Sequence, residues 1–345
     1  MIDTSLLLIV LAAELAVLLL VLGLLIIRSV LLALRGPGRR RRIRQAESDL
    51  ITAIESGRPT SYPFAKLGRK DQIEVIFELL PSLSGEPRKR LAAVASDNGI
   101  ADWGLKWCDS RHWFVRLRGA EVLSVLGERG PVLMLLGDER AEVRIRAVEW
   151  AAAEPQSAEL EKLCLMLGDP DPGVRFTVAD GLLRVGGNAV NPLVRTIERD
   201  AGPDTTEAAL RVASGIGDHR LAALAIEHCQ DPRDGVRAAA AAACGSVGGD
   251  DAARTLISLL DDPDPDVRRE AVNSLGRMNS WASAPKVAVL LGDDEWPVKR
   301  AAAVVLDGFG PPGRLYLRRV ASSDDGPASK IASQALGTFE AEARA

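Results

Sequence analysis

The chain has 345 residues, enough for two ordinary domains or for one long repeat array. Aromatic residues make up 4% of it, and its apolar residues are mostly Ala, Leu and Val, which favours closely packed helices over a broad β core. Its formal charge is −4, but without the seven arginines and two acids of residues 1–45 there remain 36 basic and 45 acidic residues, a net of −9. Such an acidic body argues against nucleic-acid binding, which depends on neutralising phosphates.

The first segment in chain order is strongly apolar. From Ser5 to Ile27 it has 23 residues and one charged side chain, Glu14. At ~1.5 Å of helical rise per residue, this length spans the ~30 Å hydrocarbon core of a bilayer. A cleavable signal peptide is the alternative, but the segment is too long, no basic residue precedes it and no small-residue cleavage site follows it. We therefore predict a transmembrane anchor helix over residues 1–34.

Glu14 is the one ionisable residue within this apolar span. A charged side chain near the middle of a membrane helix costs about 2.5–3.5 kcal/mol on insertion scales. Ala12 and Ala16 have the small-xxx-small spacing that lets two helices approach closely. One hypothesis is that Glu14 contacts another transmembrane helix, in a partner or in a second copy. The other is that a leucine-rich helix tolerates one protonated carboxyl group.

The residues after the span are basic. Because cytoplasmic flanks of membrane helices are enriched in Lys and Arg, we predict a single-pass protein of the cell membrane, with its N-terminus outside and its main part in the cytoplasm. The Gly-Pro-Gly of residues 36–38 is expected to end the helix and to begin a basic juxtamembrane linker over 35–60. This linker contains four consecutive arginines, Arg39, Arg40, Arg41 and Arg42. They serve either as a topology signal or as a site that attracts anionic lipid, at ~1 kcal/mol per basic residue.

A 31-residue repeat follows. Each unit has an aspartate at the same position, at Asp138, Asp169, Asp200, Asp231, Asp262, Asp293 and Asp324. A basic residue stands six positions later, at Arg144, Arg175, Arg237, Arg268, Lys299 and Lys330, while Thr206 takes this place in one unit. Because every unit has the same pair, we expect a structural ladder in which each aspartate caps a helix or pairs with an arginine of its own or an adjacent unit. A row of ligand-binding charges is the alternative.

Each unit reads as two helices joined by a turn. Asp264 is placed to cap the second helix of its unit, and Pro265 suits the first turn, where its missing N–H needs no partner. Val267, Ala271 and Leu275 then recur at i, i+4 and i+8, which is one face of a helix. With a degenerate first unit over about 69–99, the sequence predicts an all-α solenoid of about nine two-helix repeats over 61–345.

The repeat resembles the HEAT family, in its short bacterial form that is also called the PBS-lyase-type HEAT-like repeat. The likeness lies in the turn aspartate, the Val-Arg at the start of the second helix, the alanine three or four positions later and the closing Leu-Gly. It covers about residues 65–340. The resemblance implies the fold but not the function, because the same repeat occurs in adaptors, lyases and nucleic-acid enzymes.

Few side chains in the sequence have the spacing of a catalytic or metal site. The three histidines, His112, His219 and His228, have no metal-type spacing to each other or to a cysteine, so we predict no metal and no cofactor. No nucleotide-binding or nucleophile-elbow motif is present, and we expect no enzymatic activity. The cysteines are widely spaced and read as buried apolar residues: Cys108, Cys164, Cys229 and Cys244.

Tryptophans are the remaining candidates for function. Trp103, Trp107 and Trp113 lie within eleven residues, and Trp296 occupies a turn position where other units have small or polar residues. Exposed tryptophans are typical anchors of protein interfaces, so these four are candidate partner-binding residues. The alternative is that they fill the core at the N-terminal end of the solenoid.

These features together predict a membrane-tethered adaptor that binds a protein along the surface lined by the second helices of the repeats. HEAT-like proteins with such an anchor resemble bacterial proteins that accompany membrane enzymes such as glycosyltransferases. Two other classes stay open: a bilin lyase, which the PBS-type repeat permits, and a DNA-alkylation repair enzyme of HEAT type. The anchor argues against both of them, the shortage of histidine against the lyase, and the acidic body against the repair enzyme.

Overall fold

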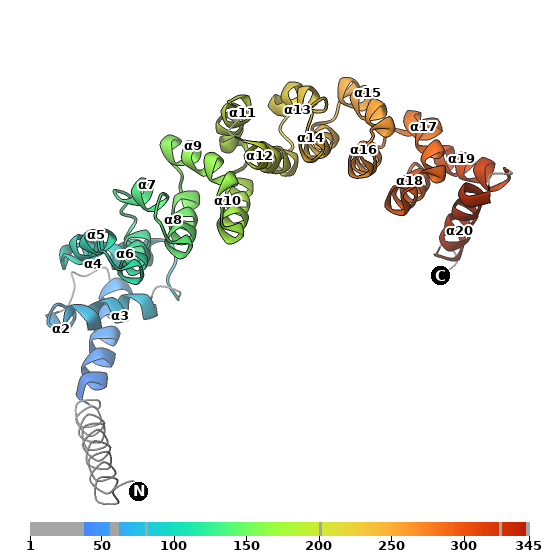
Figure 1. The fold of residues 1–345 in the computed structure, drawn as a ribbon. Helices are drawn as coiled ribbons and strands as arrows, with labels where there is room; N and C mark the ends of the chain where they lie inside the picture. Colours follow the sequence, from blue (N-terminus) through green and yellow to red (C-terminus); the bar gives the residue numbers. More distant parts are fainter. Residues whose placement is uncertain (1–37, 56–61, 80–81, 200–201, 324–325, 343–345) are drawn as a thin grey trace, which may run out of the picture. The chain divides into compact units, whose positions relative to one another are not determined.

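The computed structural model describes residues 38–55, 62–79, 82–199, 202–323 and 326–342 (Figure 1). The anchor expected over 1–34, with Glu14, lies outside these residues. Within them, every helix is too short or too polar to traverse a bilayer. The described residues form two units: residues up to Arg111 with Glu121–Arg129, and His112–Ala120 with Gly130 onward. Helix α6 (Trp113–Leu126) contributes to both units.

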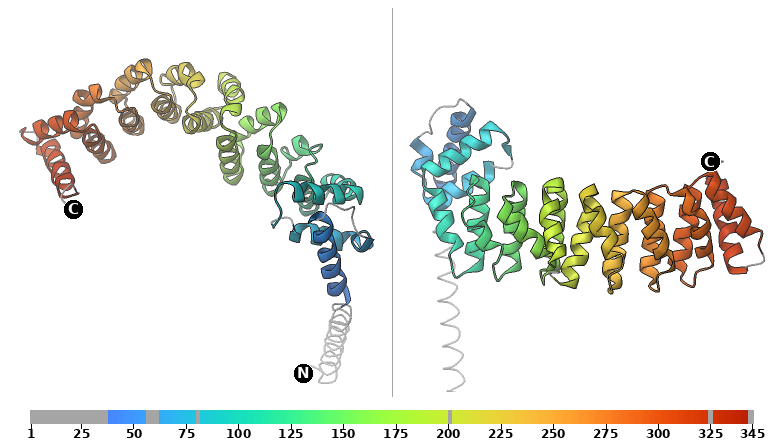
Figure 2. Two further views of the ribbon diagram at one scale, coloured as in Figure 1. Left: turned by 180° about the vertical axis from the view of Figure 1, so that it is seen from behind. Right: turned by 90° about the horizontal axis from the view of Figure 1, so that it is seen from above.

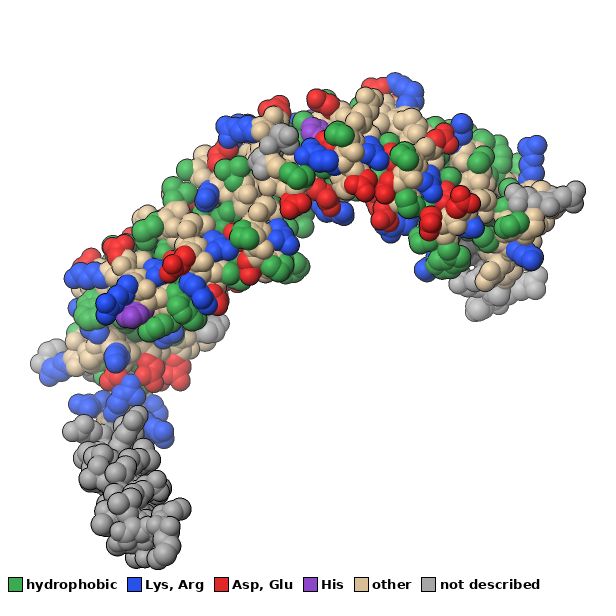
Figure 3. Space-filling view, viewed as in Figure 1, with side chains coloured by type: hydrophobic (Ala, Val, Ile, Leu, Met, Phe, Trp, Pro, Cys, Tyr) green, Lys and Arg blue, Asp and Glu red, His purple; other side chains and the backbone are tan. Residues whose placement is uncertain are grey.

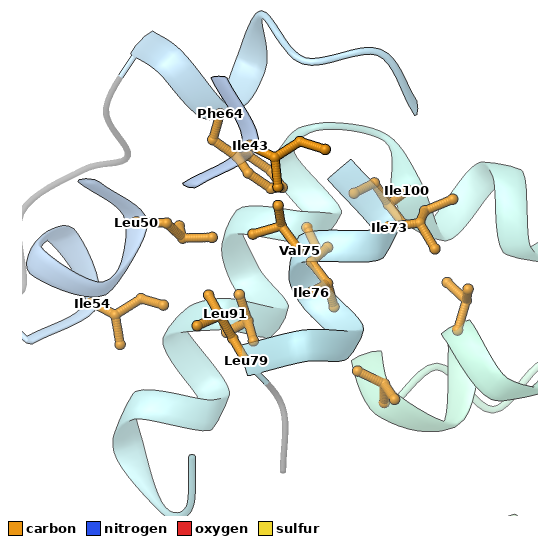
Figure 4. Close-up of a cluster of buried hydrophobic side chains, with 13 residues drawn as sticks. Ile43, Leu50, Ile54, Phe64, Ile73, Val75, Ile76, Leu79, Leu91 and Ile100 are labelled. Atoms are coloured by element: carbon orange, nitrogen blue, oxygen red, sulfur yellow. The ribbon is translucent and has the colours of Figure 1, made fainter. Parts of the chain in front are cut away.

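The first unit is a small helical bundle. Its elements are a helix over 38–55, α2 (Tyr62–Ala65), α3 (Arg69–Leu79), α4 (Glu86–Asp97), α5 (Ile100–Cys108) and the second half of α6. Its core contains Leu50, Phe64, Ile76 and Leu91, all at most 3% exposed (Figure 4). The helix pair α3 and α4 occupies the range in which the sequence predicts a degenerate first repeat.

Residues 38–55 differ from the linker that the sequence predicts over 35–60. Instead of a linker they form a helix whose buried side chains Ile43, Ala46, Leu50 and Ile54 recur every three or four residues. The run of arginines hides this apolar face in the sequence, because the charged side chains occupy the positions just before it. Residues 62–111, which the sequence assigns to the solenoid of 61–345, pack with this helix in the first unit.

The second unit is a row of seven helix pairs. The first helices of the pairs, here called A helices, are α7 (Val132–Leu135), α9 (Ser157–Leu165), α11 (Val190–Glu198), α13 (Ala222–His228), α15 (Asp250–Ser258), α17 (Ala284–Val289) and α19 (Pro311–Ala321). The second, or B, helices are α8 (Ala141–Ala153), α10 (Pro172–Val185), α12 (Pro203–Ile216), α14 (Asp234–Val247), α16 (Pro265–Arg277), α18 (Trp296–Gly308) and α20 (Gly326–Glu342). Within this unit the two kinds of helix form two layers, with the B helices side by side (Figures 1 and 2).

The turn sequence explains where each B helix begins. The Asp264 carboxylate accepts hydrogen bonds from the backbone N–H groups of Asp266 and Val267, and Asp171 accepts one from Val174. Proline follows both capping aspartates, as expected for a first helical turn. The B helices then pack closely: a Cβ atom added to Gly245 of α14 would lie 2.5 Å from Ser274 Cβ of α16.

Arginine–aspartate pairs join consecutive repeats. The Nε and Nη2 atoms of Arg268 donate to the two carboxylate oxygens of Asp293 at 2.8 and 2.9 Å, and its Nη1 donates to the backbone oxygen of Asp262 at 2.8 Å. One guanidinium thus binds its own turn and the turn of the next repeat. The same two-oxygen pairing occurs in Arg116–Asp138, Arg144–Asp169 and Arg237–Asp262.

The ladder changes where Thr206 replaces arginine. An arginine at position 206 would pair with Asp231. In its absence, Arg233 of the same turn as Asp231 donates to the two carboxylate oxygens of Asp231, at 2.7 Å each. Arg175 donates to the backbone oxygen of Asp169 at 2.7 Å. The next-repeat aspartates of Arg175 and Lys299, at positions 200 and 324, lie outside the described residues.

Candidate partner-binding surface

Each B helix leaves one stripe open to solvent. In α10 the buried side chains Val174, Val178 and Leu182 face the interior of the unit, while Phe176, Asp180 and Leu183 are exposed. The exposed positions recur every three or four residues, so they form one face of the helix. Because neighbouring B helices lie side by side, their stripes join into one continuous surface, here called the B face. In Figure 1 it is the inner side of the row in the second unit.

One end of the B face carries aromatic and aliphatic side chains. Ile145 and Phe176 stand 31 residues apart, each as the fifth residue of its helix, α8 or α10, and Phe114 is the second residue of α6. Phe114 is 58% exposed and Phe176 is 75% exposed. Phenylalanine side chains this accessible are uncommon on a water-facing surface and are typical of an interface.

Trp113 and its neighbours lie at the start of this apolar end. The Trp113 ring meets the Phe114 ring edge-on at 6.2 Å between centroids, and the Arg140 guanidinium lies 5.0 Å from the Trp113 centroid. His112 stacks on Phe114 at 5.5 Å. Trp113 therefore belongs to an aromatic cluster at one end of the B face, and the Arg140 guanidinium lies over its ring.

The other end of the B face has a cleft between α18 and α20. It has a volume of about 260 Å³ and is lined by Trp296, Lys299, Arg300, Ala303, Val304, Ile331, Gln334 and Ala335. Trp296 is 62% exposed, and the Arg300 guanidinium lies 5.6 Å from its ring centroid. The lining of this cleft is mostly apolar and includes two cationic side chains.

Between these two ends the B face is polar. Figure 3 shows carboxylate side chains gathered on the inner side of the row near α12, α14 and α16. A second cleft, of about 140 Å³, lies there and is lined by Arg211, Asp234, Gly235, Ala238, Asp264, Asp266, Arg269 and Glu270. Phe114, Phe176 and this cleft were not predicted from the sequence. The 31-residue register of Ile145 and Phe176 was the available signal.

The other two candidate tryptophans belong to the first unit. Trp103 and Trp107 of α5 meet edge-on, with 6.1 Å between ring centroids. Trp107 packs against the buried cluster of that unit, while Trp103 is 40% exposed. Of the pair, Trp107 has the core role named as the alternative, and Trp103 keeps an accessible ring. The structure thus brings Trp103 to Trp107 and keeps Trp113 and Trp296 at opposite ends of the B face.

The fold of the first unit gives the four consecutive arginines different surroundings. Arg39 donates through Nε to the Asp71 carboxylate at 3.0 Å and through Nη2 to that of Glu74 at 2.7 Å. The side chains of Arg40, Arg41 and Arg42 are exposed. Three of the four arginines are therefore accessible to an anionic surface.

Nucleophilic and metal-binding groups are few in the described part of the chain. All four cysteines are buried thiols. Burial raises the pKa of Cys108 and Cys164 to about 12, so both stay protonated near neutral pH. No group of three or more His, Cys, Asp or Glu side chains that could hold a metal ion occurs among the residues described.

Comparison with known proteins places the repeats in a family. A model of HEAT repeats matches residues 130–214, 190–263, 221–307 and 253–337, which together cover more than half of the 345 residues. No curated protein matches the chain. The phycocyanin lyase complex of CpcE and CpcF from Nostoc sp. PCC7120 is 21% identical, with a TM-score of 0.40 over 44% of this chain and 99% of that one.

Two karyopherin structures are also similar. Kap121p bound to RanGTP is 14% identical with a TM-score of 0.54, and the match covers 85% of this chain and 41% of that one. Kap121p bound to Nup53p is 13% identical with a TM-score of 0.53, over 87% and 41%. The chain spans about two fifths of these karyopherins, and such low identity shows a shared fold alone. On its repeats, the chain belongs to the HEAT-repeat family.

Proposed function

We propose that this protein is a scaffold that binds a protein partner along the B face of its second unit. The observation that carries the proposal is the 75% exposure of Phe176, with Ile145 at the same position of the neighbouring helix α8. Exposed aromatic side chains lose unfavourable contact with water when a partner covers them. The bilin-lyase and DNA-repair interpretations stay untested predictions.

The proposed scaffold is tethered to the cell membrane by residues 1–34, with its repeats in the cytoplasm. The support for this is in the sequence: 23 residues with one charged side chain from Ser5 to Ile27, followed by the arginine run. The exposed side chains of Arg40, Arg41 and Arg42 are then placed to attract anionic lipid headgroups. A tether at the membrane favours a membrane-associated partner, such as a membrane enzyme.

Membrane fractionation tests the tether. The full-length protein should stay with the membrane through an alkaline carbonate wash, and a version without residues 1–34 should be released. Release of the full-length protein would refute the tether. It would leave the B-face binding proposal untouched.

Affinity purification from the native membrane in mild detergent tests the binding. A stoichiometric partner should be captured by the wild-type protein and lost with Phe176→Ser. The matched control is Val289→Ser, because Val289 is 71% exposed but lies on A helix α17. Capture that is unaffected by Phe176→Ser, or equally lost with Val289→Ser, would contradict binding on the B face.

A further inference from the structure

The B face changes its chemistry along the row in an order that fits an extended polypeptide. Helix α10 presents Phe176, α14 presents small residues within a polar cleft, and α18 presents Trp296. We propose that the B face binds an extended protein segment with an apolar side chain near each end and one Lys or Arg side chain between them. This rests on the proposed function and deepens it by naming the chemistry of the segment.

The polar cleft exists because α14 has no long side chains on its open stripe. That stripe consists of Asp234, Gly235, Ala238 and Ala242. A Cβ atom added to Gly235 would lie 2.4 Å from Oε2 of Glu207, so this α12 side chain leans over α14. The backbone of α14 thus forms the floor of the cleft, and side chains of α12 and α16 form its walls.

The charges around this cleft leave an excess of carboxylate. Three ion pairs each include at least one residue that lines it: Arg211–Glu207 at 2.8 Å, Arg269–Asp266 at 2.7 Å and Arg277–Glu270 at 2.9 Å. Asp234 and Asp264 line the same cleft and form no ion pair in the part of the chain that the structure describes. Asp264 also caps α16, and the Arg237 guanidinium acts on both carboxylates from a distance. An arriving guanidinium or ammonium group therefore meets two carboxylates that have no direct ion-pair partner.

The two ends of the B face favour apolar side chains. On α10, Phe176 is 75% exposed and Leu183 is 44% exposed. On α18, Trp296 and Val304 border the cleft of about 260 Å³, which is roomy enough for a large aliphatic or aromatic side chain. Buried anchors of this kind supply most of the affinity of a typical interface, while charges between them set the register.

The helix spacing converts this order into a sequence pattern. Adjacent packed helices are ~8–10 Å apart, so the two steps from α10 to α14 cover roughly 20 Å, as do the two steps from α14 to α18. An extended chain advances ~3.3 Å per residue, so each distance corresponds to about six residues. The pattern is an apolar residue, a basic residue about six positions later and a second apolar residue about six positions after that.

Fluorescence anisotropy with the full-length protein in detergent tests the pattern. The probe is a labelled peptide in a Ser/Gln background with Leu, Arg and Leu at the spacing given above. Replacing its Arg with Glu, or halving the two spacings, should weaken binding at least about tenfold, because one anchor or the central ion pair is then lost. A peptide with only the Arg should also bind at least about tenfold more weakly.

Protein variants locate the contacts. We expect weaker binding of the probe peptide with Phe176→Ser, Trp296→Ser and Asp234→Asn. Phe176→Leu should preserve this binding, and Val289→Ser should have no effect on it. The helical circular dichroism of each variant checks that it is folded. Equal binding of the Arg and Glu peptides, or equal loss with Val289→Ser, would overturn the inference. If peptides show no preference while native partner capture still depends on Phe176, the inference fails and the scaffold proposal stands.

Discussion

Arg268 shows how a single side chain joins two repeats. Its guanidinium binds the Asp293 carboxylate of the next turn and the backbone oxygen of Asp262 in its own turn. The side chains of Arg268 and Asp293 are only 15% and 6% exposed, so water cannot replace these bonds well. The pair therefore differs from the exposed ion pair Arg254–Asp251, whose side chains are 70% and 76% exposed.

Arg268→Gln should destabilise the second unit by about 2–4 kcal/mol, because it leaves the buried Asp293 carboxylate without its cation. Arg254→Gln is the matched control and should change the free energy of unfolding by less than about 1 kcal/mol. Urea denaturation followed by circular dichroism measures both. Equal effects of the two substitutions would show that the ladder does not hold the repeats together.

The same Arg–Asp pairs make the free energy of unfolding depend on pH in the acidic range. Burial of Asp293 by itself raises the pKa of its carboxyl, but hydrogen bonds from Arg268 and from the Glu295 backbone N–H outweigh burial, so this pKa lies below its ordinary value. Asp138 behaves alike, with burial opposed by Arg116. A lowered carboxyl pKa contributes stability that is complete above the unfolded-state value of about 4 and is lost as pH falls through the folded-state value.

We therefore expect the free energy of unfolding to decrease as pH drops below about 4, and to decrease less steeply in Arg268→Gln, which has lost one such carboxylate interaction. Urea titrations at a series of pH values give the slopes. An acid slope that the substitution leaves unchanged would exclude the Asp293 pair as its source.

At the scale of helices, close approach is fixed by small residues. In α19, a Cβ atom added to Gly313 would lie 1.8 Å from the backbone oxygen of Leu306 in α18. Backbone atoms cannot swing aside as a flexible side chain can. In contrast, a Cβ atom on Gly308, the last residue of α18, would meet no atom within 4 Å.

Gly313→Ala should thus force α18 and α19 apart and cost about 1–3 kcal/mol, the usual range for overpacking. Gly308→Ala should be neutral or stabilising, since alanine favours a helix more than glycine by about 1 kcal/mol. Thermal unfolding of the two variants separates these cases. A stable Gly313→Ala protein would mean that the α18–α19 contact is looser than described.

Much of the element scale follows from sequence, because turn residues act locally. Asp264 and Pro265 mark the start of α16 by capping and by geometry, and the 31-residue spacing places the other B helices. Two features depend on contacts that a spacing cannot show. The guanidinium of Arg268 binds the next repeat with two nitrogens and its own repeat with the third, and Trp107 packs into a core while Trp103 does not.

The B face was the least predictable part. Exposure of Phe176 depends on which side of α10 the neighbouring helices leave open, and that is decided by packing across repeats. The cleft over α14 is harder still, because Glu207 of α12 and Arg277 of α16 reach over Gly235 and Ala242, whose side chains are absent or small.

At the scale of the whole molecule, each repeat contacts only its nearest neighbours. The protection of backbone amides from hydrogen exchange should therefore vary along the row. Helix α14 buries Val236, Ala239, Ala240, Ala241, Ala243, Cys244 and Gly245 between α12 and α16. We expect its backbone amides to exchange hydrogen most slowly, and those of α20 to exchange fastest among the B helices. Hydrogen–deuterium exchange mass spectrometry checks this, and uniform exchange across the second unit would contradict it.

Because the Arg–Asp pairs have a constant register, the row can be shortened by one whole repeat. Removing residues 263–293 joins Asp262 to Asp294, at a turn, and keeps the partnership of Arg237 with Asp262. Gly245 then takes the place of Gly276 against Val305, since the two glycines are 31 residues apart. Such a chain would bind a segment about three residues shorter, and without Asp264 and the α16 wall of the polar cleft it would lose the preference for a central basic residue.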